Sequence, residues 1–126
     1  MAATDPQAVH ALFLERFQAG DVDGLLDLYE PTATFVAEPG TPVAGHEAIR
    51  AAIAGFLALG GTFTMESRLL AQTGDLAQLA SIWTLSAKNA DGSPLELAGV
   101  GTEVARRQAD GTWKLAIDNP WGVAGL

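Results

Sequence analysis

Apolar residues in the N-terminal half of the chain recur at the spacing of helices. A first helix is predicted from Thr4-Asp5-Pro6, where a capping oxygen precedes a proline, to a stop at Gly20. A second, short helix is expected between Asp21 and Pro31, and a third ends at Gly60-Gly61. The apolar faces of the first and third helices are formed by Val9, Leu12, Phe13, Phe17, Ile49, Ala52, Ile53, Phe56 and Leu57.

The rest of the chain has the pattern of β-strands. Residues 32–37 favour a strand, and residues 38–42, which hold two prolines, are predicted to form a turn or loop. Four further apolar-rich runs follow at residues 62–73, 76–89, 95–108 and 112–119. The dipeptides between them are typical of hairpin turns: Gly74-Asp75, Asp91-Gly92 and Asp110-Gly111. Helices followed by a meander predict an α+β fold with one mainly antiparallel sheet, and residues 1–126 are predicted to form a single domain.

Composition and charge narrow the classes of function. The 126 residues are 48% hydrophobic and carry a net charge of −8, which disfavours binding to phosphate backbones. Cysteine is absent, which excludes disulfides, thiolate metal sites and cysteine nucleophiles. No apolar run reaches the ~20 residues that span a membrane, and the N-terminus lacks the pattern of a signal peptide. We therefore expect a cytoplasmic protein without nucleic-acid or membrane partners.

Two acidic residues are predicted to face one another in the last hairpin. If Asp110-Gly111 forms a two-residue turn, Ala109 lies opposite Thr112. Counting back along both strands then places Glu103 opposite Asp118. The same face carries small or compact residues and the other face bulkier ones, so one side of the sheet is open, either to a cavity or to solvent. A slip of one residue would separate the pair.

Paired carboxyl groups support acid–base chemistry in a poorly solvated site. Desolvation and a neighbouring charge raise the pKa, so that one carboxyl of such a pair stays protonated near neutral pH. A protonated acid can donate a hydrogen bond to a developing oxyanion, and an ionised one can act as a base. Glu103 and Asp118 are therefore candidate catalytic residues.

Two segments of the chain, ATFVAEPGTPVAGHEAIRAAI and GTWKLAIDNPWG, are typical of one known family. Through them the chain resembles the NTF2-like superfamily, specifically the SnoaL-like and DUF4440-type branch related to ketosteroid isomerase, and the resemblance covers nearly the whole chain. It implies a cone in which a curved sheet is wrapped by three N-terminal helices around an apolar pocket for a small hydrophobic molecule. It also implies a homodimer formed through the convex face of the sheet. Side chains expected to contact a ligand are Phe13, Phe17, Phe35, Phe56, Asn119 and Trp121.

The resemblance also suggests roles for particular residues. The general base of ketosteroid isomerase corresponds to Glu38, a carboxylate directly before Pro39. Glu103 takes the place of that enzyme's protonated oxyanion donor, a role for which ketosteroid isomerase is the standard example. The tyrosine donor falls on Phe13, which has no hydroxyl, so an efficient ketosteroid isomerase is not expected. Asp118 matches by position a pocket aspartate of cyclase-like and epoxide-hydrolase-like members.

Several other residues are expected to be structural. In a simple Asp91-Gly92 hairpin, Trp83 pairs with Val100 and belongs to the core or a dimer surface. Gly99 and Gly101 are expected to make room inside the curved sheet or to mark a bend.

Neither histidine is predicted to take part in chemistry. His10 and His46 are both expected to be solvated, and no spacing of His and carboxylate residues indicates a metal site.

Two functions stay open. The first is an isomerase or cyclase that acts without a cofactor on a small apolar carbonyl compound, with Glu38 as base and Glu103 or Asp118 as neutral acid or orienting partner. The second is a non-catalytic module for small-ligand binding or dimeric interaction. The paired acids favour the first, and the missing tyrosine favours the second.

Overall fold

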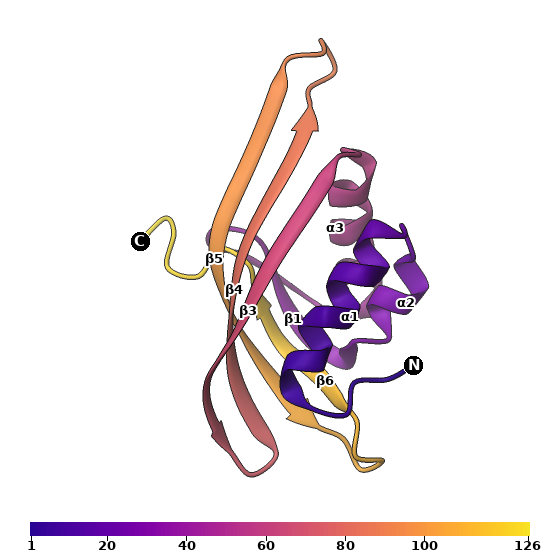
Figure 1. The fold of residues 1–126 in the computed structure, drawn as a ribbon, viewed down its shortest axis with the longest axis vertical. Coiled ribbons are helices and arrows are strands. Elements are labelled where there is room, and N and C mark those ends of the chain that lie inside the picture. Colours follow the sequence, from indigo (N-terminus) through magenta and orange to yellow (C-terminus); the bar gives the residue numbers. More distant parts are fainter.

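Three helices cover one face of a curved, six-stranded sheet (Figure 1). The computed structural model describes all residues, 1–126. The helices are α1 (Pro6–Gln18), α2 (Val22–Leu26) and α3 (His46–Ala58). The strands are β1 (Tyr29–Glu38), β2 (Thr41–Ala44), β3 (Thr62–Thr73), β4 (Leu76–Lys88), β5 (Pro94–Arg107) and β6 (Trp113–Asn119). This arrangement confirms the predicted α+β fold class.

The sheet has the strand order β2-β1-β6-β5-β4-β3. All neighbouring pairs are antiparallel except β1 and β6, which run parallel, so the sheet is mixed but mainly antiparallel. The parallel pair joins the first strand of the chain to the last and sets Phe35 beside Asp118. An N-terminal element thereby reaches the acidic pair of the last hairpin.

Side-chain caps begin the first two helices where the sequence predicts. The Asp5 carboxylate accepts the backbone N–H of Ala8 at 2.9 Å, and Pro6 occupies the first turn. The Asp21 carboxylate accepts the N–H of Gly24 at 2.9 Å. Each cap satisfies an N–H group that has no partner within its helix.

The second helix is shorter than predicted. It ends at Leu26, so Tyr29 and Pro31 belong to β1 rather than to the helix and its stop. Pro31 has no N–H to donate, and it is tolerated because the pairing of β1 with β6 is irregular between Tyr29 and Thr34.

The predicted turn at residues 38–42 is also shorter than expected. Only Pro39 and Gly40 connect β1 to β2, and Gly40 adopts a positive φ of 80°. Pro42 lies in β2, which is an edge strand of the sheet. An edge strand accommodates proline because half of its backbone N–H groups have no neighbouring strand to bond.

The β4–β5 hairpin differs by one residue from the predicted register. Trp83 pairs with Gly99, and Val100 pairs with Ile82, because residues 89–93 form a longer loop in place of a two-residue turn. Asn89 N–H donates to the Ser93 carbonyl at 2.8 Å inside this loop. The predicted pairing of Trp83 with Val100 was therefore wrong, and Trp83 is buried against the helices.

Two groups of buried apolar side chains lie between the helices and the sheet. The larger contains 16 residues, among them Tyr29, Phe35 and Leu115. The smaller consists of Phe63, Trp83 and Leu85, packed against α1 and α3. None of the helices is long and apolar enough to cross a membrane.

Candidate active site

Glu103 on β5 and Asp118 on β6 lie directly opposite one another, in the register that the sequence predicts. Their exposed fractions are 2% and 6%. The connection between them differs from the prediction. Gln108 N–H donates to the Thr112 carbonyl at 2.7 Å, which leaves three residues, 109–111, in the loop, and a bulge at Ala116 restores the register. The longer loop and the bulge offset each other, so Glu103 and Asp118 are paired as predicted.

His10 of α1 is a third buried polar group at this place. Its exposed fraction is 3%. Its Nε2 lies 2.9 Å from Glu103 Oε1, and its Nδ1 lies 2.7 Å from Ser67 Oγ on β3. The prediction that His10 is solvated was wrong, because α1 packs against the sheet through the face that carries this residue.

Tyr29 supports Asp118 from the neighbouring strand. The phenol O–H of Tyr29 donates to Asp118 Oδ2 at 2.5 Å, and Tyr29 has an exposed fraction of 0%. His46, also predicted to be solvated, is half-buried, and its Nε2 donates to the backbone carbonyl of Tyr29 at 3.0 Å. Tyr29 is therefore fixed at both its backbone and its side chain.

Burial sets the protonation of the cluster. Burial raises the pKa of the Glu103 carboxyl to about 8, although the nearby Ser81 hydroxyl acts to lower it. Burial and then the Glu103 charge raise the pKa of Asp118 to about 7, against the Tyr29 hydrogen bond and the His10 charge. Burial lowers the pKa of His10 and raises that of Tyr29 well above its ordinary value. Near neutral pH, Glu103 is thus protonated, His10 is neutral, and Asp118 is the first carboxyl to ionise.

The contact between His10 and Glu103 is close but poorly aligned. His10 Nε2 and both carboxyl oxygens of Glu103 are buried, and their contacts with each other and with the nearby Ser81 hydroxyl are not aligned as hydrogen bonds. Asp118 differs, because Tyr29 provides it with a hydrogen bond. The polar atoms of His10 and Glu103 thus lack the aligned hydrogen bond that Asp118 has.

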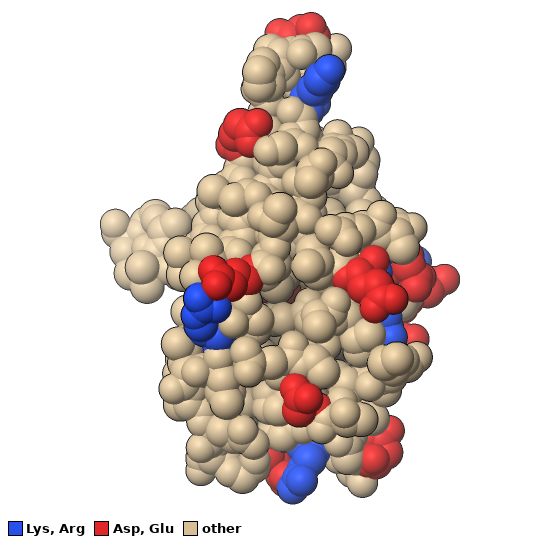
Figure 2. All heavy atoms as spheres, viewed as in Figure 1, with Lys and Arg blue, Asp and Glu red and all other residues tan.

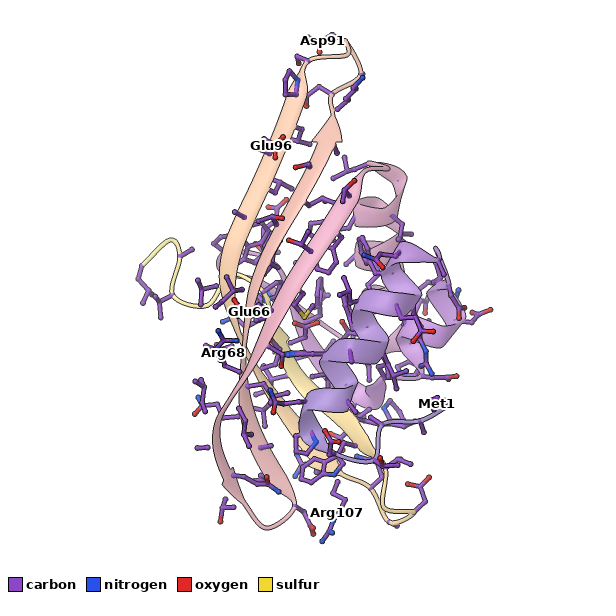
Figure 3. All side chains as sticks on the ribbon, viewed as in Figure 1. Met1, Glu66, Arg68, Asp91, Glu96 and Arg107 are labelled. Atoms are coloured by element: carbon purple, nitrogen blue, oxygen red, sulfur yellow. The ribbon has the colours of Figure 1, made fainter.

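An apolar cavity lies beside these groups, between the two sets of core side chains. Its empty volume is about 570 Å³, counted with its open mouth. The lining residues are His10, Phe13, Phe17, Phe35, Phe56, Phe63, Met65, Ser81, Trp83, Leu85, Glu103, Leu115, Asp118 and Pro120. Side chains from α1, α3 and the sheet meet in the space between the two layers (Figure 3). A few polar groups in an apolar enclosure are typical of a small-molecule site.

Four of the six predicted ligand-contacting residues line this cavity: Phe13, Phe17, Phe35 and Phe56. Asn119 and Trp121 are not among the lining residues. Asn119 Nδ2 donates to the Gly122 carbonyl at 2.9 Å, and Trp121 Nε1 donates to the Ala37 carbonyl at 3.1 Å. Both side chains thus hold the C-terminal segment against the sheet.

Two glycines make room for the polar groups, as the sequence predicts. A Cβ at Gly101 would lie 2.4 Å from Ser81 Oγ and 2.6 Å from Glu103 Oε2. A Cβ at Gly99 would lie 2.9 Å from Trp83 Nε1, which donates to the Pro120 carbonyl at 2.6 Å. The missing side chains leave space for the Glu103 carboxyl and for the Trp83 ring.

The sequence matches the family described as the SnoaL-like domain over residues 9–116. The chain belongs to this family. No curated protein matches the sequence.

Solved structures share the fold of this SnoaL-like domain at low sequence identity. A ketosteroid isomerase-like protein from Erwinia carotovora atroseptica aligns with a TM-score of 0.79 and 17% identity, over 89% of this chain and 88% of that one. A proposed dehydratase of the NTF2-like family from Streptomyces avermitilis aligns with a TM-score of 0.74 and 18% identity, over 94% of each chain. A proposed aromatic ring hydroxylase from Novosphingobium aromaticivorans aligns with a TM-score of 0.78 and 20% identity, over 93% of this chain and 85% of that one. These likenesses establish the NTF2-like cone, and the different names show that the cone does not specify one reaction.

Glu38, the base suggested by resemblance, stands apart from the acidic pair in this SnoaL-like domain. It lies at the exposed end of β1, opposite Thr41, and does not line the cavity. The register shifts between Val36 and Glu38, so a bulge precedes the carboxylate. Phe13, at the position of the tyrosine donor of ketosteroid isomerase, lines the cavity but has no hydroxyl to donate. The acids Glu103 and Asp118 both line the cavity.

The sequence analysis did not predict that His10 belongs to the site or that Tyr29 is the hydrogen-bond partner of Asp118. The signal for His10 was its helical spacing, since His10, Phe13 and Phe17 lie three and four residues apart and so share a face. Nothing local marks Tyr29, because its partner is far away in the chain. No group of three or more His, Cys, Asp or Glu side chains is placed to hold a metal ion.

Proposed function

We propose that this SnoaL-like domain is a cofactor-independent isomerase or cyclase that moves a proton within a small, apolar carbonyl compound. The observation that carries the proposal is the set of buried polar atoms without aligned partners, His10 Nε2 and the two oxygens of Glu103, beside an apolar cavity. An unsatisfied buried polar group costs about 1–3 kcal/mol and is rare in folded proteins. A carbonyl oxygen bound in the cavity would accept a hydrogen bond from protonated Glu103 and remove part of this cost.

Asp118 is suited to be the base of this reaction. It ionises before Glu103, with a pKa of about 7, and a base poised near the working pH is the most effective. The Tyr29 hydroxyl bonds Oδ2 and leaves Oδ1 for a substrate. Asp118 would take a proton from the carbon next to the carbonyl, and the C–H electron pair would form an enolate whose oxygen is bonded by Glu103.

The second half of the reaction distinguishes the isomerase from the cyclase. In an isomerase, Asp118 returns its proton to a different carbon of the enolate system. In a cyclase, the enolate carbon forms a bond to a second carbonyl carbon of the same molecule, and the proton passes to the oxygen of that carbonyl. Both reactions return Asp118 to its ionised form and Glu103 to its protonated form, so neither reaction consumes a co-reactant.

The test is turnover of a panel of small apolar carbonyl compounds by the wild-type protein and by Asp118→Asn. General base catalysis contributes about 10²–10⁴-fold, so the variant should lose that factor in kcat with a small change in KM. Glu38→Gln is the matched control, since this exposed carboxylate should be dispensable. If no compound turns over faster with the wild-type protein than with Asp118→Asn, the proposed reaction is wrong.

A ligand-binding module is a second candidate, favoured by the pairing of Asp118 with Tyr29. This hydrogen bond satisfies one carboxyl oxygen without any ligand. A binding module would hold a carbonyl compound through Glu103 and His10 and release it unchanged. In that case Glu103→Gln would weaken binding, and neither the wild-type protein nor Asp118→Asn would convert the ligand.

We also propose that the protein forms a homodimer through the sheet face opposite the helices. Ile82 and Val100 are paired neighbours on this face, with exposed fractions of 42% and 58%, and Ile117 is 44% exposed. The same face also carries the ion pair of Glu66 and Arg68 on β3, whose side chains point away from the helices in Figure 3. In the view of Figure 2, charged side chains are scattered rather than gathered in one large patch. Burial of the exposed apolar side chains against a second copy would remove them from water.

A further inference from the structure

A second hollow lies next to the cavity, between the C-terminal ends of α1 and α3. This hollow, here called the outer groove, has an empty volume of about 1040 Å³ when the open solvent above it is counted. Its lining comes from the end of α1 and the residues after it, the C-terminal half of α3 and two strands, and includes Phe17, Ala54, Phe56, Ala58, Phe63 and Leu85. Most of these residues are apolar, and none carries a charge, although 17% of the residues of the chain are charged.

The outer groove and the cavity share one wall. Phe17, Phe56, Phe63 and Leu85 line both spaces. The rings of Phe17 and Phe63 are 4.6 Å apart at their centroids, and Phe17 and Phe56 are half-buried at the ends of different helices. The touching rings of Phe17 and Phe63 close part of this wall, so a molecule longer than the cavity would reach the outer groove by displacing the half-buried side chain of Phe17 or Phe56.

We propose that the outer groove is a subsite for an uncharged apolar tail of the substrate. This inference rests on the proposed function, because the carbonyl head of the same molecule would lie in the cavity beside Glu103 and Asp118. The substrate is then an elongated, neutral carbonyl compound with an alkyl or aryl extension. A tail that ends in a carboxylate or a phosphate does not fit, since the groove offers no cation to pair with it.

Binding of a homologous series of methyl ketones, from butanone to decanone, tests this subsite. Each methylene that leaves water for an apolar groove improves affinity by about fourfold. We expect the dissociation constant, measured by NMR titration, to fall by that factor along the series for the wild-type protein. Decanone should also bind at least about tenfold more tightly than the keto acid of the same length, because a buried, unpaired carboxylate is unfavourable.

Two substitutions on α3 distinguish the effect of filling the outer groove from the effect of adding bulk elsewhere on the helix. Ala54→Trp fills the outer groove, and Ala51→Trp places the same bulk at an exposed position outside it. In Ala54→Trp the gain per methylene should stop at the chain length that fills the cavity, while butanone binds as in the wild-type protein. Ala51→Trp should reproduce the wild-type series. Ala58→Trp, at the end of the helix, is a second groove-filling variant if Ala54→Trp does not fold.

The outcomes distinguish this subsite from the proposed function. If butanone binds but affinity levels off at the same length in the wild-type protein and in Ala54→Trp, the tail subsite is wrong and the head site stands. An unbroken gain along the series in both groove-filling variants would overturn it as well. If butanone and decanone leave the resonances of Glu103 and Asp118 unchanged, the proposed carbonyl site itself fails.

Discussion

At the scale of single residues, burial determines the chemistry of Glu103 and Asp118. Both carboxyls have folded-state pKa values, about 8 and about 7, above those of the unfolded chain. The folded protein therefore binds more protons than the unfolded chain between about pH 4 and pH 8. Stability contributed by this difference is fully present below the unfolded pKa values and is lost as the pH rises through about 7 and 8.

The free energy of unfolding should consequently fall between pH 5 and pH 9. Urea denaturation at several pH values measures it, and Glu103→Gln should show a smaller fall because it removes one of the two titrations. The same pH dependence in the variant and in the wild-type protein would contradict the assignment of a raised pKa to Glu103.

Tyr29 gives a second prediction at this scale. Its hydrogen bond lowers the pKa of Asp118, so Tyr29→Phe should raise that pKa further above its ordinary value. Loss of the bond should also cost about 1–3 kcal/mol of stability, since Asp118 keeps a buried oxygen without a partner. Carbon-detected NMR titration of Asp118 measures the first effect, and an unchanged or lower pKa in the variant would show that the Tyr29 bond does not stabilise the ionised form.

At the scale of elements, glycines in β5 decide how closely the strands and polar side chains approach. Gly101→Ala should destabilise the fold by about 1–3 kcal/mol and displace the Glu103 carboxyl, because its Cβ would lie under 3 Å from three atoms of neighbouring residues. Gly55→Ala is the control, since Gly55 lies in α3 with open space around it and should gain about 0.5–1 kcal/mol. Thermal unfolding of both variants measures the contrast, and equal effects would show that crowding at Gly101 is unimportant.

Loop length is the second factor at this scale. In the β4–β5 hairpin, the shift of one residue put Gly99 instead of Val100 beside the buried Trp83 and left Val100 exposed. In the β5–β6 hairpin, the longer loop was compensated by the bulge at Ala116, so Glu103 and Asp118 still met. Side chains alternate between the faces of a strand, so an uncompensated shift of one residue exchanges the faces.

At the scale of the whole molecule, we expect self-association through the sheet face opposite the helices, because apolar side chains are exposed there. Ile82→Lys introduces a charge into the exposed apolar pair with Val100 and should shift the protein from dimer to monomer in light scattering after gel filtration. Val123→Lys is the control, because Val123 is 75% exposed in the C-terminal segment beyond β6. A wild-type protein that is monomeric at high concentration, or an Ile82→Lys variant that stays dimeric, would contradict the proposed interface.

The sequence by itself determined the elements and much of the pocket. Helical spacing, the caps at Asp5 and Asp21, and hairpin dipeptides are local signals, and they predicted the helices, the meander and the α+β class. The hairpin dipeptide Asp110-Gly111 also placed Glu103 opposite Asp118, and this pairing holds because the bulge at Ala116 offsets a loop that is one residue longer than predicted.

Only the tertiary structure decided which groups surround those acids. His10 reaches Glu103 because α1 packs on the sheet, and Tyr29 reaches Asp118, 89 positions along the chain, because β1 pairs in parallel with β6. Glu38 matched a local motif, yet the β1–β2 hairpin left it exposed. Contacts between distant segments depend on how whole elements pack and pair, and that packing also sets the desolvation that raises the pKa values of the two buried carboxyls.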